Sequence, residues 1–231
     1  MCGDYLRNRR DVERFWMLVR HNPGLVQITF PRIGTIEDMS QDYVLETLST
    51  MKNLKDLDLE WMPLDLPTLL NAVPQLQRLR GFALERLSSL QQDYSKLRHL
   101  SYPNKIDICE LLNLLGHLPG LEELQLWQIL VMPSASPTNM KAIVSSSASF
   151  PRLKTLRLDG AISSFEDEFV SLLIGLFPSL VRLWIGTFRP ATRNVLWEKC
   201  YLLESINGRG EAGPIVAWRD RRAKDAFNRQ R

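Results

Sequence analysis

Cysteine and long apolar runs are both scarce in this chain of 231 residues. Its three cysteines, Cys2, Cys109 and Cys200, are scattered and do not form the pairs typical of a disulfide framework or a zinc site. No segment reaches the ~18 consecutive apolar residues that a membrane-spanning helix requires, and no apolar segment follows the polar start. These absences argue against secreted disulfide-rich and membrane-spanning proteins. We expect a cytoplasmic or nuclear protein that makes no contact with membranes.

Motifs for catalysis or cofactor binding are absent as well. His21, His99 and His117 have no carboxylate or cysteine at the spacing of metal ligands. The sequence contains no glycine-rich phosphate loop, no Gly-x-Ser-x-Gly and no His-Glu-x-x-His. We interpret Cys109 and Cys200 as buried helix residues rather than nucleophiles. The prediction is a protein that is not an enzyme, with no catalytic residue, no metal and no cofactor.

Leucine, by contrast, is abundant and periodic. The stretches FPRLKTLRL (150–158) and FPSLVRLWI (177–185) are nearly identical, and their Leu-x-x-Leu-x-Leu pattern recurs along the chain. Successive copies lie 21 to 32 residues apart, and most intervals fall in the range of leucine-rich repeats, roughly 20–29 residues. The copies, the last of them degenerate, begin at Leu25, Leu54, Leu76, Leu97, Leu121, Leu153, Leu180 and Leu203.

The segments between the copies have helical periodicity. Apolar residues recur on one face over 44–51 and 66–73, and Asp107 with Glu110 has the spacing of a capping box. Neighbouring units of this kind share one core because none can bury its apolar face alone. The sequence therefore predicts an α/β leucine-rich-repeat solenoid over 1–208. We expect a right-handed horseshoe of about eight irregular repeats, with a parallel sheet on the concave face and helices on the convex face.

The repeats resemble leucine-rich-repeat proteins of the ribonuclease-inhibitor-like class. Within that class, FWMLVRHNPGLVQITF (15–30) is similar to the repeat region of fungal F-box proteins. The resemblance covers about residues 11–208 and implies the substrate-recognition region of a ubiquitin-ligase adaptor. No F-box-like segment precedes the first repeat in this sequence. Ubiquitin-ligase components are therefore expected as partners if a missing segment supplies the F-box.

Alternation along each strand predicts which side chains face a partner. The second and third leucines of the motif point into the core, so the residues beside them point outward. The third repeat places Gly81 where an apolar residue is expected, so we expect its strand to be short. We predict a protein partner on the concave face, bound by Asp56, Asp58, Glu60, Arg78, Arg80, Trp127, Arg157, Arg182 and Trp184.

The outward residues fall into two groups with different interpretations. Asp56, Asp58 and Glu60 form an acidic row, and the next repeat carries Arg78 and Arg80. These rows either pair with each other or bind a ligand. Near the other end of the repeats, tryptophan and arginine occur together, and these residue types dominate interface energetics. There the alternative is that a loop of the protein itself covers Trp184.

Basic residues are concentrated in the segment 209–231. It holds seven Lys or Arg and three acids, a balance of +4, whereas the whole chain has a net charge of +3. Three interpretations remain open: a helix that caps the last repeat, a basic patch for nucleic acid or nuclear import, or a segment that packs on nothing. A nuclear or nucleic-acid-associated factor, or a regulator of an enzyme or small GTPase, is therefore the alternative function. The near-neutral body makes nucleic acid the less favoured partner.

Overall fold

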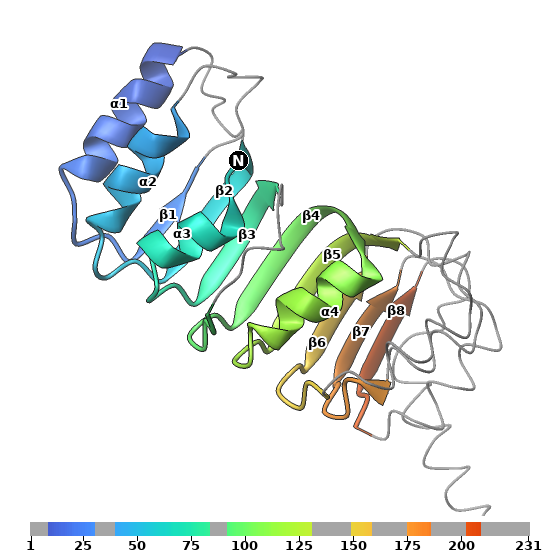
Figure 1. Ribbon diagram of the computed structural model, residues 1–231. Coiled ribbons are helices and arrows are strands. Elements are labelled where there is room, and N and C mark those ends of the chain that lie inside the picture. The colour runs from blue at the N-terminus through green and yellow to red at the C-terminus, as the bar shows by residue number, and fades with distance from the viewer. Residues whose placement is uncertain are drawn as a thin grey trace, which may run out of the picture. The chain divides into compact units, whose positions relative to one another are not determined.

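The computed structural model describes residues 9–30, 40–83, 92–130, 149–158, 175–185 and 202–208 (Figure 1). Over these residues the chain is α/β, with eight strands and four helices. It divides into two compact units, which are described separately. The first unit is Met1–Asn104 with Asn113–Leu121, and the second is Lys105–Leu112 with Glu122–Arg231. One domain over 1–208 stays a prediction.

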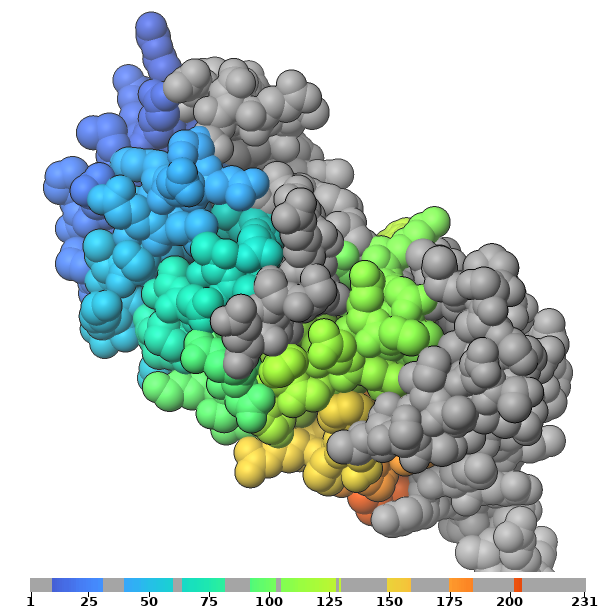
Figure 2. Space-filling view, in the orientation of Figure 1, coloured from blue at the N-terminus to red at the C-terminus, as the bar shows by residue number. Residues whose placement is uncertain are grey.

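The first unit contains four strands that pair in parallel in chain order. They are β1 (Gln27–Thr29), β2 (Asp56–Pro63), β3 (Arg78–Ala83) and β4 (His99–Asp107), the last three residues of β4 belonging to the second unit. The helices α1 (Arg9–Arg20), α2 (Gln41–Ser49) and α3 (Leu66–Ala72) lie on one side of these strands (Figure 1). In the same orientation their side chains form a continuous surface (Figure 2).

The second unit repeats the parallel arrangement. Its strands are β5 (Glu123–Leu130), β6 (Thr155–Leu158), β7 (Arg182–Ile185) and β8 (Ser205–Gly208), again paired in chain order. Helix α4 (Ile108–Gly116) contributes residues to both units. The predicted α/β class with parallel strands is confirmed, and the arrangement is compatible with a solenoid.

A tight turn at the start of each motif explains why proline so often precedes its first leucine. The amide of that leucine donates to the carbonyl three residues earlier, as in Leu76 N to Val73 O (3.1 Å) and Leu180 N to Phe177 O (3.1 Å). Pro74 and Pro178 thereby occupy the second position of the turn, where a fixed φ is favourable. Val73 and Phe177, which open these two turns, are buried, so both turns are also anchored in the core.

In most motifs the second residue links its repeat to the next one. Its carbonyl accepts from two successive amides of the following repeat, as Lys55 O does from Gln77 N and Arg78 N (both 2.9 Å). In the second unit Lys154 O accepts in the same way from Val181 N (2.8 Å) and Arg182 N (2.9 Å). These bonds satisfy backbone groups at the starts of these strands. They hold successive motifs in the same phase, so the leucines of neighbouring strands align.

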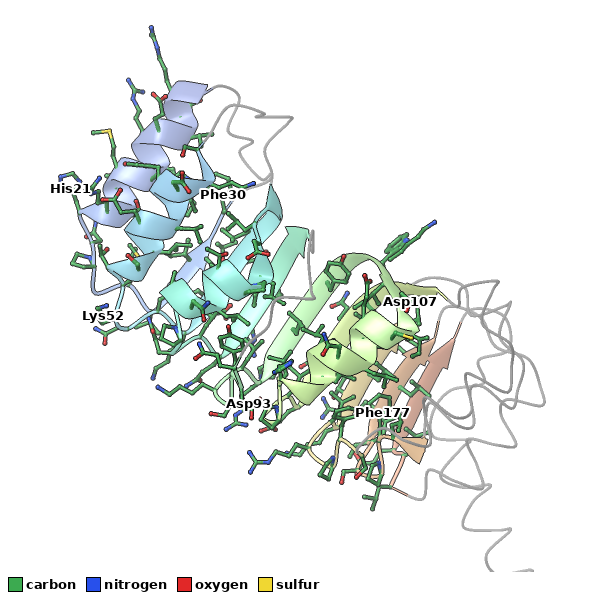
Figure 3. All side chains as sticks on the ribbon, viewed as in Figure 1. His21, Phe30, Lys52, Asp93, Asp107 and Phe177 are labelled. Carbon is green, nitrogen blue, oxygen red and sulfur yellow. The ribbon has the colours of Figure 1, made fainter. Side chains whose placement is uncertain are left out.

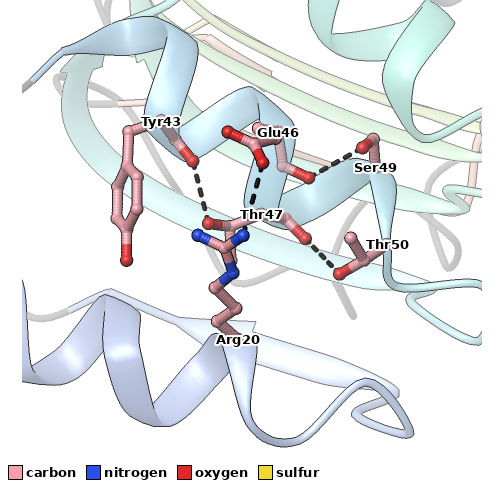
Figure 4. A network of polar contacts seen from close by, with 6 residues as sticks. All are labelled: Arg20, Tyr43, Glu46, Thr47, Ser49 and Thr50. Carbon is pink, nitrogen blue, oxygen red and sulfur yellow. Dashed lines mark hydrogen bonds and ion pairs between the residues drawn. The ribbon is translucent and has the colours of Figure 1, made fainter.

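The core consists of the motif leucines and the inner faces of the helices. Trp16 in α1 is fully buried, as expected for a core residue, and packs near Phe30, with ring centroids 5.5 Å apart. Helix α1 also meets α2 at the surface, where Arg20 pairs with Glu46 at 3.4 Å and lies over the Tyr43 ring (Figure 4). Both charged side chains are about half exposed or more, so this pair adds little stability.

Two helices begin at aspartate caps. The predicted capping box of α4 is confirmed at Asp107, which is labelled in Figure 3. Asp107 Oδ1 accepts from Cys109 N (2.7 Å), and Asp107 N donates to Glu110 Oε2 (3.4 Å). Asp65 caps α3 by accepting from Thr68 N (3.0 Å). This cap was not predicted, although an aspartate two residues before Pro67 is a recognisable helix start.

The predicted short third strand is wrong. Strand β3 continues through Gly81, whose φ of 70° is accessible to glycine at no steric cost, to Ala83. The irregularity lies in the pairing instead: Asp58 pairs with Arg80, but the next pair joins Met62 and Phe82. Strand β2 therefore has additional residues opposite Gly81, the pattern of a β-bulge.

The interpretation of Cys109 as a buried residue is also wrong. Helix α4 buries Ile108, Leu111, Leu112 and Leu115, which share one helical face, and Cys109 lies about 100° around the helix from Ile108. Its thiol is exposed. Partial desolvation, and then the carboxylate of Asp107, raise the pKa of Cys109 above its ordinary value. The thiol is therefore protonated at neutral pH.

Candidate binding faces

Outward side chains of β2 and β3 form a compact charged cluster in the first unit. Asp56 lies opposite Arg78, and Asp58 lies opposite Arg80, because the two strands pair in parallel without a shift up to this point. Arg78 Nη1 donates to Asp56 Oδ2 at 3.2 Å. Arg80 reaches both acids, with its Nη2 3.7 Å from Asp56 Oδ1 and its Nε 3.7 Å from Asp58 Oδ2. Of the two interpretations open for these rows, the structure shows mutual pairing.

This paired cluster is partly shielded from water. The aspartate side chains retain 18% of their surface, whereas the two arginines retain 43%. Carboxylates held in this way are already compensated, so a ligand would have to displace existing partners to use them. Glu60, the third predicted acid, belongs to the irregular part of β2, where Phe82 pairs with Met62 instead. The side chain of Glu60 lies outside the described residues.

The outward face of β5, β6 and β7 in the second unit has a different character. We call it the Trp–Arg face and define it by Glu123, Gln125, Trp127, Arg157, Arg182 and Trp184. One row of the sheet places Gln125, Arg157 and Trp184 on successive strands, and the next row places Glu123, Thr155 and Arg182 there. The structure thus brings together four residues that were predicted to bind a partner.

The tryptophan and arginine side chains of the Trp–Arg face are exposed enough to make extensive contacts with a ligand. Trp127 keeps 53% of its surface exposed, Arg157 and Arg182 are exposed, and Trp184 is half-buried. With strands ~4.8 Å apart and a residue pair every ~6.6 Å along a strand, the Cα atoms of Trp127 and Trp184 lie about 12 Å apart. Both rings can therefore contact one ligand. The loop predicted as a cover for Trp184 begins after Leu130, outside the described residues.

Two further residues refine this face. Thr155 has an outward position in the alternation of β6 but retains only 8% of its surface. It lies between Glu123 and Arg182 in the register, and these longer side chains flank it on both sides. Glu123 and Gln125 were predicted as outward-facing residues but were not included in the predicted binding set. Their membership follows from the strand register, which the spacing of the motifs already implies.

Other types of site are not supported by the described part of the chain. Within it, no group of three or more His, Cys, Asp or Glu side chains is placed to hold a metal. No helix among those residues is both long and apolar enough to cross a membrane. The basic segment 209–231 and Cys200 lie outside the described residues, so their predicted roles stay predictions.

Comparisons with known proteins bear on the fold alone. No protein-family model matches the chain, and no curated protein matches it. Among solved structures, the chain is similar to a structural-genomics target from Bacteroides fragilis, with a TM-score of 0.50 and 16% identity. The match covers 88% of this chain and 72% of that one. At this level of identity the likeness concerns backbone architecture and carries no statement about activity.

Proposed function

We propose that the chain is a leucine-rich-repeat solenoid of the ribonuclease-inhibitor-like class and acts as a non-enzymatic scaffold that binds a protein partner. In this proposal the strands line the concave face of a right-handed horseshoe of about eight repeats. The strand-per-motif correspondence and the repeated carbonyl linkage between motifs support this architecture. The binding surface is the Trp–Arg face.

One observation carries the functional part of the proposal. Two tryptophans and two arginines share the outward side of three adjacent strands, where Trp127 is 53% exposed. Tryptophan and arginine are the residue types most enriched among those that dominate binding energy at interfaces. The charges of β2 and β3 are already paired with one another and are a weaker candidate, so we assign Asp56, Asp58, Arg78 and Arg80 to stability rather than recognition.

The specific role we propose is the substrate-recognition region of an F-box-type ubiquitin-ligase adaptor. The support is the similarity of residues 15–30 to repeats of fungal F-box proteins. In this role the partner would be a protein marked for degradation. We expect its cellular abundance to rise when this protein is removed, and its ubiquitination to fall. Unchanged abundance and ubiquitination of a verified partner would leave a binding scaffold without the ligase role.

The test of binding is affinity capture from cell lysate, read by mass spectrometry. The face variant is Trp127→Ala/Arg182→Glu, and its matched control is Met17→Ala/Arg152→Glu. Met17 is also 53% exposed, and Arg152 is an exposed arginine in the turn before β6, so both variants remove a similar apolar surface and reverse one charge. We expect a partner that the intact protein and the control capture and the face variant loses.

A third variant that ends at Gly208 separates the alternatives. Loss of the partner only with this truncation would assign recognition to the basic segment and contradict the role of the Trp–Arg face. A steep dependence of that binding on salt would then indicate nucleic acid, because phosphate contacts release counterions.

A further inference from the structure

The charge balance of the two outward faces differs, and this difference indicates the chemistry of the partner. On β2 and β3 two arginines meet two aspartates, and the outward row is neutral. On the Trp–Arg face two arginines accompany one glutamate, so the balance is +1. The described outward residues of β6 and β7 include both arginines and no acid. The centre of the Trp–Arg face is therefore basic as well as aromatic.

We propose that the Trp–Arg face binds an extended acidic segment of a partner protein, whose carboxylates contact Arg157 and Arg182 and whose apolar side chains contact Trp184 and Trp127. The inference rests on the proposed function and specifies its ligand. Arginine is suited to this task because its planar guanidinium binds a carboxylate through two parallel hydrogen bonds. The two tryptophans supply the apolar contact area that charge pairs alone do not provide.

The spacing of the arginines matches an extended chain. Arg157 and Arg182 lie on neighbouring strands and differ by one row, because Arg157 pairs with Trp184 while Arg182 pairs with Thr155. Strand spacing places their Cα atoms about 8 Å apart. In an extended peptide, side chains on one face recur every ~6.6 Å. Long arginine side chains readily accommodate the difference between this spacing and that of their own Cα atoms. Acids at alternate positions of the ligand therefore reach both arginines.

The same face is poorly suited to nucleic acid. Glu123 is exposed and lies two strands from Arg182 in the same row, where it would repel a phosphate backbone. Glu122 lies immediately before it at the entrance to β5 and pairs with Lys154 at 3.0 Å. Single-stranded nucleic acid requires a continuous basic groove along its backbone, and two arginines beside an acid do not form one. Glu123 would instead favour a basic or neutral residue beside the acidic part of a peptide.

The test is selection from a displayed library of random linear peptides on the intact chain. We expect enrichment of Asp and Glu at alternate positions, followed by an apolar residue. A selected peptide should bind Arg157→Glu/Arg182→Glu at least about tenfold more weakly, since each lost charge-assisted hydrogen bond contributes on that scale. The control Lys52→Glu/Arg152→Glu has the same net charge, places both changes in exposed turns, and should retain the affinity.

The charge reversal also predicts a gain of binding. Selection on Arg157→Glu/Arg182→Glu should enrich lysine and arginine in place of acids. Circular dichroism will verify that the charge-reversed variant and its control are folded. If the charge-reversed variant is unstable, Arg157→Gln/Arg182→Gln removes the two positive charges without adding acids. Peptides without an acidic bias, or no selected peptide, would overturn this inference. So would tighter binding of single-stranded oligothymidylate than of any selected peptide.

Failure of the acidic-ligand inference can be distinguished from failure of the proposed scaffold function. A partner captured from lysate and lost with Trp127→Ala/Arg182→Glu keeps the scaffold proposal even when the library shows no acidic bias. Conversely, acidic peptides that bind the Trp–Arg face while no cellular partner depends on it would leave the ligand chemistry correct and the scaffold proposal unsupported.

Discussion

The outward strand faces of the two units arise from the same repeated motif, but their side chains have different relationships to one another. In the first unit the register places Asp56 opposite Arg78 and Asp58 opposite Arg80, and the charges pair. In the second unit it places Arg157 opposite Trp184 and Arg182 opposite Thr155. A repeat fixes where side chains point, while the register between repeats decides which outward side chains become neighbours.

The largest loss of stability is expected from substitution of a buried motif leucine. Leu156 is 1% exposed and pairs with Leu124 and Leu183 on the neighbouring strands. Leu156→Asp buries a carboxylate without a partner and should lower the free energy of unfolding by about 4 kcal/mol or more. Its exposed neighbour provides the control: Arg157→Asp should change stability by less than about 1 kcal/mol. Urea unfolding followed by circular dichroism measures both, and an unchanged midpoint for Leu156→Asp would contradict the alternation drawn for β6.

A smaller effect is expected at a close backbone approach in the first unit. A Cβ at Gly120 would lie under 3.0 Å from the carbonyl oxygen of Ser95 and from Arg98 Nη1, which donates to Gly120 O at 2.7 Å. Gly120→Ala should therefore cost about 2 kcal/mol. Gly116, at the end of α4, has nothing within 4 Å of such an atom, so Gly116→Ala should stabilise by about 0.5 kcal/mol. Thermal unfolding of both variants tests the contrast, and equal melting temperatures would refute it.

Removal of single charges distinguishes the two faces directly. Asp56→Ala leaves Arg78 and Arg80 beside each other without their shared acid, and we expect a loss of about 1 kcal/mol, limited by the partial exposure of both arginines. Arg182→Ala removes an exposed charge and should change stability by less than about 0.5 kcal/mol. A double-mutant cycle between Asp56 and Arg78 isolates the pair. A larger loss for Arg182→Ala than for Asp56→Ala would reverse the assignment of the two faces.

The smallest effect concerns salt. Affinity for an acidic peptide should fall a few-fold as sodium chloride rises through the physiological range, because exposed arginines are screened over about 10 Å. The melting temperature should change little over that range, since the aspartates of the β2–β3 cluster are mostly shielded from solvent. Fluorescence anisotropy and thermal unfolding at each salt concentration provide the two curves. A peptide affinity independent of salt would indicate that the arginines do not contact the ligand.

Much of the fold was predictable because the motif is a steric requirement repeated along the chain. Leu57, Leu79, Leu124 and Leu156 are all essentially buried, as their positions in the pattern require. The cap at Asp107 followed from local spacing alone. The wrong prediction of a short β3 concerned neighbours that are distant in sequence, because the length of β3 depends on its irregular pairing with β2. The burial of Thr155 depends likewise on side chains of β5 and β7.

Side-chain contacts between repeats could not be predicted from the sequence either, because their partners are distant along the chain. Gln75 Nε2 donates to Met51 O at 2.6 Å, and Tyr94 Oη donates to Asn71 Oδ1 at 2.8 Å. Each joins residues more than twenty positions apart, and no periodicity assigns such a partner. The exposure of Cys109, by contrast, follows from local periodicity, because Ile108, Leu111 and Leu112 define the buried face of α4.

The sequence by itself determined the parallel α/β repeat, its turns and the direction of alternate side chains, because each depends on residues within one motif. It also determined which residue types the outward rows contain. Only the tertiary structure decided that Asp56 meets Arg78 while Trp184 meets Arg157, because the register between strands sets these neighbours. Electrostatic pairing acts over a few ångströms across strands, and that distance has no counterpart in the spacing along the chain.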